Sequence, residues 1–164
     1  SEDINGYDHI FYTGALDAYF NHEYGRLGYR TVSFESSVHD DDYQGVAQMN
    51  FCDENIPFTR ITEHKYFTPW QQYKKTIIFK EFSRETEDGD IPYYPKRLQE
   101  DKRLLTLYRQ KAETLSNVSF LGRLATYRYL DMHQVIAEAI DFSATFLNAF
   151  SAKKISPVFP NREN

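Results

Sequence analysis

Cysteine is almost missing from this sequence. A single residue, Cys52, occurs among 164, so an internal disulfide is excluded and a reducing compartment is expected. No apolar run is long enough to cross a bilayer and no leader-like segment is evident, so we expect a cytoplasmic protein without a membrane partner. No two of the five histidines have the i, i+4 spacing of a metal-binding pair, so no metal site is expected.

Positive charge is also scarce. The chain has 19 Lys and Arg against 24 Asp and Glu, a net charge of −5. Without a basic run, nucleic acid is not expected as a partner, and any anionic ligand must be held by a local group of arginines. The glycine patterns that bind phosphates, G-x-G-x-x-G and the P-loop, are missing too.

Aromatic residues, in contrast, are abundant. They make up 16% of the chain, with 13 Tyr and 13 Phe. A tyrosine combines a flat apolar ring with a hydroxyl group, which suits both packed sheets and surfaces that contact rings and phosphates. Most of these residues are expected to pack sheets, and the remainder are available to a ligand.

The two ends of the chain have patterns typical of strand–glycine–helix units. Residues 7–14 form a short apolar run that ends in glycine, and residues 15–25 have the spacing of a short helix with a glycine stop. Residues 117–122 predict another strand that ends in glycine, and residues 132–150 predict a long helix. The tail, residues 151–164, is expected to run over the surface.

The middle of the chain alternates as β-strands do. Strands are predicted within residues 29–36, 43–51 and 76–82, separated by the turn-like runs HDDD, DENIP, TPW and EDGD. Strands in direct succession indicate an antiparallel sheet. Residues 96–116 then have a helical period. The apolar side of that helix is expected to contain Leu98, Leu104, Leu105, Leu107, Tyr108, Ala112 and Leu115.

These patterns predict an α+β fold with an inserted lobe. An antiparallel sheet lobe, residues 28–95, is expected to lie in sequence between two strand–helix pieces of another lobe, residues 1–27 and 96–150. The tail at 151–164 follows.

The run GRLATYRYLDM, residues 122–132, concentrates cationic and aromatic side chains directly before the last helix. Asp131 is placed to N-cap that helix, because its carboxylate can accept free amide hydrogens of the first turn. In the alternative, those amides bind a ligand's anionic or hydroxyl groups, and Arg123 and Arg128 add positive charge. A capped helix beside surface arginines is the simpler interpretation, although the pair Tyr127 and Tyr129 favours a ligand.

The run PFTRITEHKYFTPW, residues 57–70, is a second candidate. Arg60 and Thr62 share one face of a predicted strand, with Ile61 on the other. An arginine on a sheet face can clamp a carboxylate or phosphate, or it can pair with a neighbouring acidic residue, which the pattern alone favours. His64 could act as a base, although a lone histidine is more often a structural hydrogen-bonding group.

Six runs resemble, in this order, the C-terminal part of UDP-galactopyranose mutases of the bacterial type. They are YTGALDAYF, YGRLGYR, QMNF, PFTRITEHKYF, IPYYP and GRLATYRYLDM. The resemblance extends from Tyr7 to Leu147, and its longest runs are specific. It implies an isomerase that interconverts UDP-galactopyranose and UDP-galactofuranose with reduced FAD as a covalent catalyst. It also implies that the lobe around the sheet is a Rossmann-like FAD-binding lobe.

The resemblance also implies roles for particular residues. Arg60 would be catalytic and would contact the substrate diphosphate, which the hydroxyl groups of Tyr94 and Tyr129 would also bind. Asn50 and Arg30 would line the substrate site.

The run before the last helix would serve the flavin. Arg123, together with Leu130, Asp131 and Met132, would form an FAD-binding turn. Asp131 would also be catalytic, as an acidic residue near the flavin and the sugar.

Other parts of the mutase pattern are missing from this sequence, including the glycine-rich unit for the ADP half of FAD and a helical domain. We therefore expect a C-terminal portion that lacks activity alone and does not retain FAD. Its exposed apolar surface predicts self-association into a homo-oligomer. Two alternatives stay open: a non-catalytic nucleotide-sugar-binding module, and a segment of another FAD-dependent enzyme, such as an amine-oxidase-like protein.

Overall fold

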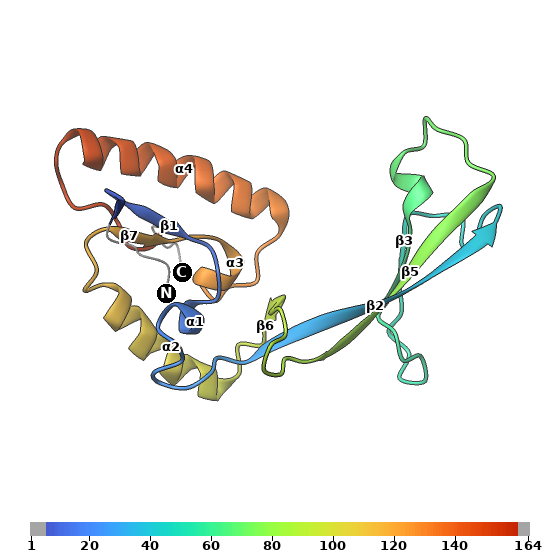
Figure 1. Cartoon of the computed structure of the whole chain (residues 1–164), viewed down its shortest axis with the longest axis horizontal. Helices are drawn as coiled ribbons and strands as arrows, with labels where there is room; N and C mark the ends of the chain where they lie inside the picture. Colours follow the sequence, from blue (N-terminus) through green and yellow to red (C-terminus); the bar gives the residue numbers. More distant parts are fainter. Residues whose placement is uncertain (1–5, 161–164) are drawn as a thin grey trace. The chain divides into compact units, whose positions relative to one another are not determined.

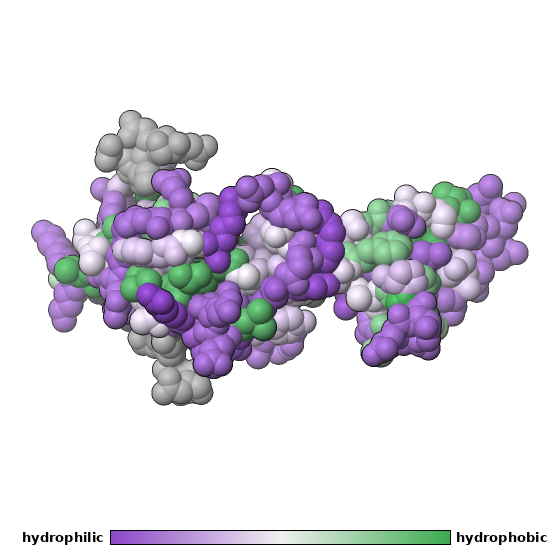
Figure 2. Space-filling view, turned by 90° about the horizontal axis from the view of Figure 1, so that it is seen from below, coloured by the Kyte–Doolittle hydropathy of each residue, from purple (hydrophilic) through white to green (hydrophobic). Residues whose placement is uncertain are grey.

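The computed structural model describes residues 6–160, which divide into two compact units (Figure 1). The first unit contains both ends of the chain, up to Tyr29 and from Pro92 onward, and the second unit is Arg30–Ile91. The fold is mixed α/β and includes an antiparallel sheet. The surfaces seen in Figure 2 are mostly polar, with small apolar patches.

A pair of short parallel strands lies at the centre of the first unit. These are β1 (Ile10–Tyr12) and β7 (Val118–Phe120). Figure 1 shows α4 (Met132–Ser151) on one side of the pair, and α1 (Leu16–Tyr19) and α2 (Gln99–Ala112) on the other. The first unit therefore has three layers, with helices covering both faces of the strands, as parallel strands require.

The alternation of side chains along β1 explains these layers. The ring of Phe11 contacts Phe142 and Phe146 of α4. Its neighbour Tyr12 points to the opposite face, where it contacts Phe120 of β7.

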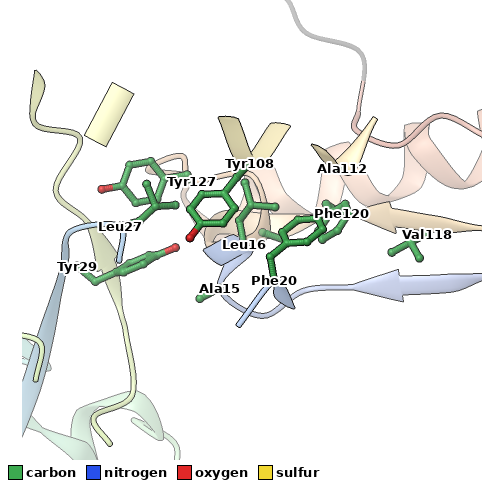
Figure 3. Packing of buried hydrophobic residues seen from close by; sticks show 11 residues of the cluster. Ala15, Leu16, Phe20, Leu27, Tyr29, Tyr108, Ala112, Val118, Phe120 and Tyr127 are labelled. Atoms are coloured by element: carbon green, nitrogen blue, oxygen red, sulfur yellow. The ribbon is translucent and has the colours of Figure 1, made fainter. Parts of the chain in front are cut away.

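The core of the first unit lies on that opposite face (Figure 3). Its buried residues are Ala15, Leu16, Phe20, Leu27, Tyr29, Tyr108, Ala112, Val118, Phe120, Ala125 and Tyr127. Burying each large apolar side chain stabilises the fold by about 1.5–3 kcal/mol. Three of these residues are tyrosines, and the hydroxyl groups of Tyr108 and Tyr127 bond to backbone carbonyls.

The second unit is a sheet whose strands pair antiparallel. The strand order within this unit is β3-β4-β5-β2. The strands are β2 (Tyr29–Asp40), β3 (Gln48–Asn50), β4 (Arg60–Glu63) and β5 (Lys75–Glu85). The two-residue strand β6 (Tyr94–Pro95) belongs to the first unit. A 3₁₀ helix, η2 (His64–Phe67), follows β4. The antiparallel pairing predicted for the middle of the chain is confirmed.

Several predicted element ends were wrong, including those of the strand predicted within 43–51, of which only β3 forms. β2 continues through His39 and Asp40, where a break was expected, because these residues pair with Thr76 and Lys75 of β5. The helix predicted at 15–25 is only α1, because Asn21 and His22 adopt positive φ angles of 51° and 56° and end it well before Gly25.

The region between the last strand and the last helix also differs from expectation. A four-residue helix, α3 (Gly122–Ala125), follows β7 and was not predicted. Leu98, expected on the apolar side of α2, is exposed because it precedes the first turn.

Up to residue 160, the tail does not run freely over the surface as predicted. The N–H of Phe120 donates to the carbonyl of Val158 at 2.7 Å, and the ring of Phe159 stacks on that of Phe120. Ser156 and Pro160 are buried. The tail therefore covers the open edge of β7. The pattern of a three-residue strand is too short to predict that the tail would be its partner.

The long helix α4 is confirmed, but most of its large apolar side chains are uncovered. Phe142 is buried and Phe146 packs against β1. Five large apolar side chains of this helix are exposed: Met132, Ile136, Ile140, Leu147 and Phe150. Within residues 6–160, no helix is long and apolar enough to cross a membrane.

Candidate functional site

Two tyrosines and an arginine of the first unit form what we call the tyrosine–arginine cluster: Tyr94, Arg123 and Tyr129. The tyrosine rings stack with centroids 5.9 Å apart and an interplanar angle of 22°. The guanidinium carbon of Arg123 lies 5.1 Å from the Tyr94 centroid and 4.9 Å from the Tyr129 centroid. Tyr129 is 57% exposed. The cluster thus brings a cation and two phenol groups together at the surface, a combination suited to an oxyanion.

Three separate elements carry this cluster. Tyr94 belongs to β6, Arg123 to α3, and Tyr129 to the turn between α3 and α4. The Nε of Arg123 donates to the carbonyl of Leu130 at 3.0 Å, and its Nη2 donates to the same oxygen. Arg123 therefore holds the turn that carries Tyr129 while its planar cation contacts both rings.

The start of α4 lies directly after this turn. Asp131 is the N-cap residue of the helix, and the side-chain oxygen of Gln134 accepts the Asp131 N–H at 2.8 Å. The predicted N-cap position is confirmed, but the bond found there joins the Asp131 backbone to Gln134, whereas the Asp131 carboxylate was expected to be the acceptor. Met132 is 83% exposed, so the positive end of a 20-residue helix faces solvent beside the cluster residue Tyr129.

Arg128, the second arginine of that run, does not join the cluster. Its Nη2 forms an ion pair with Glu138 of α4, and its Nε donates to the hydroxyl of Thr126 at 3.1 Å. Arg128 therefore ties the turn to the helix.

In the second unit, Arg60 and Asn50 meet across two neighbouring strands. They are register partners of β4 and β3, and the Nε of Arg60 donates to the Oδ1 of Asn50 at 2.9 Å. The Nη1 of Arg60 also lies 3.7 Å from a carboxylate oxygen of Glu81. The salt bridge considered for Arg60 is therefore present. Its side chain is one-third exposed, so the guanidinium group is oriented by these partners without being enclosed by them.

Arg30 lies on the same face of the sheet as Arg60, but at a different position along the strands. Glu81, which pairs with Arg60, pairs with Phe34 on its other side, and Arg30 is four residues from Phe34 along β2. That spacing is about 13 Å along a strand. The donors of Arg30 go to Ser83 and Glu85. The structure therefore groups Arg60 with Asn50 and leaves Arg30 apart.

A buried carboxylate anchors the loop beside this sheet. Glu63, on the buried side of β4, accepts the backbone N–H groups of Tyr43 (3.0 Å), Gln44 (2.8 Å) and Gly45 (3.1 Å). Burial raises the pKa of Glu63, but these hydrogen bonds outweigh it, and the net pKa is lowered. Sequence reasoning missed this role, because an acidic residue at an inward-facing strand position has no distinctive pattern.

Residues 6–160 contain no group of three His, Cys, Asp or Glu side chains that could hold an ion. The ring of His64 packs against Phe79 and Phe67, as a structural histidine would.

Comparison with known proteins gives consistent matches. Residues 1–129 match the sequence profile of the UDP-galactopyranose mutase family. The chain is 48% identical over 158 residues to a probable UDP-galactopyranose mutase of Klebsiella pneumoniae, covering 96% of this chain and 41% of that protein. It is 50% identical over 142 residues to a dTDP-fucopyranose mutase of Escherichia coli, covering 86% and 38%.

A more distant relative is the UDP-galactopyranose mutase of Mycoplasma pneumoniae, 31% identical over 137 residues, which cover 80% of this chain and 34% of that protein. The chain thus spans about two fifths or less of the length of the curated relatives it matches.

Proposed function

Because the chain belongs to the UDP-galactopyranose mutase family, we propose that it supplies the part of a mutase that binds the diphosphate of a nucleoside diphosphate sugar. The contact of Arg123 with both tyrosine rings is the observation that carries this proposal. Two phenol donors and a fixed cation at the surface match the charge and hydrogen-bonding needs of a diphosphate.

The proposed roles follow from the chemistry of each group. The hydroxyl groups of Tyr94 and Tyr129 donate to diphosphate oxygens. The resemblance to mutases assigns Arg60, which Asn50 orients, as a further charged donor. A charge-assisted hydrogen bond of this kind contributes about 1.5–3 kcal/mol. When the bond between sugar and phosphate breaks, the departing nucleoside diphosphate gains negative charge. These donors then favour bond breaking as well as binding.

The residues that the resemblance assigns to FAD are compatible with that group. The exposed start of α4 presents a positive helix end, and Arg123 keeps the Leu130 carbonyl and the following Asp131–Met132 segment in place. When bound, a reduced flavin supplies nucleophilic chemistry toward the sugar. This chain would contribute the turn that contacts the flavin, with Asp131 as an acidic residue near the flavin and the sugar.

The sugar nucleotide itself has two candidates. UDP-galactopyranose is the substrate named for one group of relatives, and dTDP-fucopyranose for a relative of almost equal identity, 50% against 48%. Both carry a nucleoside diphosphate, so the tyrosine–arginine cluster serves either. We propose UDP-galactopyranose as the substrate, because the family profile and several relatives name it. Conversion of dTDP-fucopyranose alone would reverse this assignment.

The test uses the chain alone and as part of a chimera. The chain alone is expected to show no flavin absorbance and no turnover with dithionite as reductant. A chimera in which this chain replaces the matching 158-residue segment of the Klebsiella relative is expected to retain flavin and convert UDP-galactopyranose. A folded, flavin-containing chimera that converts neither candidate substrate would overturn the proposal. Tight UDP binding by the chain alone would favour a non-catalytic binding module instead.

We also propose that the exposed side of α4 pairs with a second copy of this chain. The helix contains no Lys or Arg, and its two carboxylates are Asp141 and the ion-paired Glu138, so little charge opposes contact between two such surfaces. Replacing Ile136 and Ile140 by glutamate should weaken a dimer by at least about tenfold for each residue, because burial of an isoleucine contributes about 1.5–3 kcal/mol.

Analytical ultracentrifugation measures this effect. Ile91→Glu is the matched control, because Ile91 is similarly exposed but lies outside α4. A monomeric wild-type chain at high micromolar concentration would show that this helix face does not pair with itself.

A further inference from the structure

The segments that carry Tyr94 and Tyr129 meet at one backbone carbonyl. The oxygen of Gly28 accepts the N–H of Lys96 at 2.9 Å and the hydroxyl of Tyr127 at 2.6 Å. Lys96 lies two residues after Tyr94, and Tyr127 lies two residues before Tyr129. A single acceptor therefore ties together the two stretches of chain that must be in register for the rings to stack.

The hydroxyl of Tyr127 also receives a bond at this junction. The N–H of Arg97 points to it at 3.4 Å, a long contact that adds to the short bond with Gly28. Tyr127 is only 2% exposed, and its ring packs edge-on against Tyr29 with centroids 5.2 Å apart (Figure 3). Burial raises the pKa of Tyr127, so the hydroxyl stays protonated and able to donate.

The backbone at both ends of this contact is strained. Tyr127 has φ 52° and Arg97 has φ 59°, both in the left-handed region that side chains other than glycine seldom occupy. Such residues persist where their surroundings hold them, and they are concentrated at functional sites. Here the two strained residues contact each other through the Arg97 N–H and the Tyr127 hydroxyl. Arg97 lies three residues after Tyr94, and Tyr127 lies two residues before Tyr129.

A buried carboxylate, Asp101, also holds this junction, and its negative charge beside the Tyr127 hydroxyl contributes to the raised pKa of Tyr127. Asp101 accepts the N–H of Gly28 at 2.9 Å and the N–H of Leu98 at 2.8 Å. A Cβ at position 28 would lie 3.1 Å from the carboxylate oxygens, so glycine gives this carboxylate its close approach. The Gly28 peptide is thus held at both its N–H and its C=O groups.

We propose that Tyr127 is a positioning residue, whose buried hydroxyl fixes Tyr94 and Tyr129 face to face through the Gly28 carbonyl. The purpose of this arrangement, presenting two phenol groups to a diphosphate, rests on the proposed function. The arrangement itself does not depend on it.

Tyr127→Phe tests the proposal, because it removes the hydroxyl and keeps the ring. Tyr108→Phe is the matched control: Tyr108 is fully buried, donates to the Gly25 carbonyl at 2.6 Å and accepts the Tyr24 N–H at 3.0 Å, without contacting the Gly28 junction. Both variants are prepared in the chain itself with ¹³C-labelled tyrosine. Ring signals of residues 94 and 129 are assigned from Tyr94→Phe and Tyr129→Phe.

The readout is the nuclear Overhauser effect between the two rings. Tyr127→Phe is expected to abolish it and to move both sets of ring signals, whereas Tyr108→Phe leaves them unchanged. p-Aminophenylalanine at position 127, which restores an N–H donor, is expected to restore the effect. An intact effect in Tyr127→Phe, or an equal loss in Tyr108→Phe, would overturn the proposal.

Two further measurements keep the outcome clear. If Tyr127→Phe is poorly folded, amide exchange in the wild-type chain decides: Lys96 and Arg97 are expected to be protected together, and rapid exchange of both contradicts the proposal. UDP titration of the wild-type chain and the Klebsiella chimera reports separately on the proposed function. If UDP moves no signal of the cluster in either protein while the ring contact depends on Tyr127, the proposed function fails and the positioning role stands.

Discussion

Glu63→Gln is expected to lower the free energy of unfolding of the second unit by about 2–4 kcal/mol. The buried carboxylate accepts three backbone N–H groups, from Tyr43, Gln44 and Gly45. An amide of the same shape has one oxygen and an NH₂ group, so at least one of those donors would face another donor. Urea unfolding followed by Trp70, the only tryptophan and a residue of this unit, measures the change.

The same carboxylate predicts a pH dependence. Its folded-state pKa is lowered from the ordinary value of 4.5, so its stabilising contribution is complete above that pH and is lost as the pH falls below it. As the pH falls below 4.5, the wild-type unit should therefore lose stability more steeply than Glu63→Gln.

Glu54→Gln is the control for both experiments, because Glu54 is exposed and should change stability by less than about 0.5 kcal/mol. Equal behaviour of the two variants would show that Glu63 does not anchor the loop.

Arg60→Gln is expected to reduce kcat/KM of the Klebsiella chimera by about 10- to 150-fold, the equivalent of 1.5–3 kcal/mol. The substitution removes the guanidinium charge that we assign to the diphosphate. Arg60→Lys should recover only part of the activity, because an ammonium group keeps the charge but lacks the planar donor pair.

Arg84→Gln provides the control for Arg60. Arg84 is also an arginine of the second unit in contact with a carboxylate, Asp90, but it has no proposed role in catalysis. Because Arg60→Gln leaves Glu81 without its arginine, the thermal midpoint of each variant must accompany the kinetics. Full activity in a folded Arg60→Gln chimera would remove Arg60 from the site.

The strands and the long helices could be predicted from the sequence because their signals are local. Alternation along 29–36 and 76–82 reflects side chains that point to opposite faces, and the period of 132–150 reflects one packed side of a helix. Asp131 was predicted as an N-cap for the same reason, since capping depends on a few adjacent residues.

What could not be predicted depends on contacts between distant residues. β2 is longer than its own pattern indicates, because it pairs with all of β5. Val158 and Phe159 belong to a polar, proline-containing tail, yet they complete the core at β7. The positive φ angles of Arg97 and Tyr127 are likewise maintained by partners far along the chain.

For the candidate site, too, single residues could be identified from the sequence, whereas the contacts between them could not. The resemblance to mutases identified Tyr94, Arg123 and Tyr129 as separate residues with separate roles. The structure shows that Arg123 contacts both tyrosine rings and also holds the Leu130 carbonyl, so its part in the cluster is partly structural. No pattern in the sequence links residues 94 and 129, because their contact depends on the fold of the whole first unit.

The dissociation constant of UDP from the Klebsiella chimera, measured by calorimetry with and without the double substitution Tyr94→Phe and Tyr129→Phe, tests the central claim most directly. If the tyrosine–arginine cluster binds the diphosphate, loss of both hydroxyl groups should weaken the binding of UDP by at least about fivefold, since each neutral hydrogen bond contributes about 0.5–1.5 kcal/mol. An unchanged dissociation constant in a folded, flavin-containing double variant would contradict it.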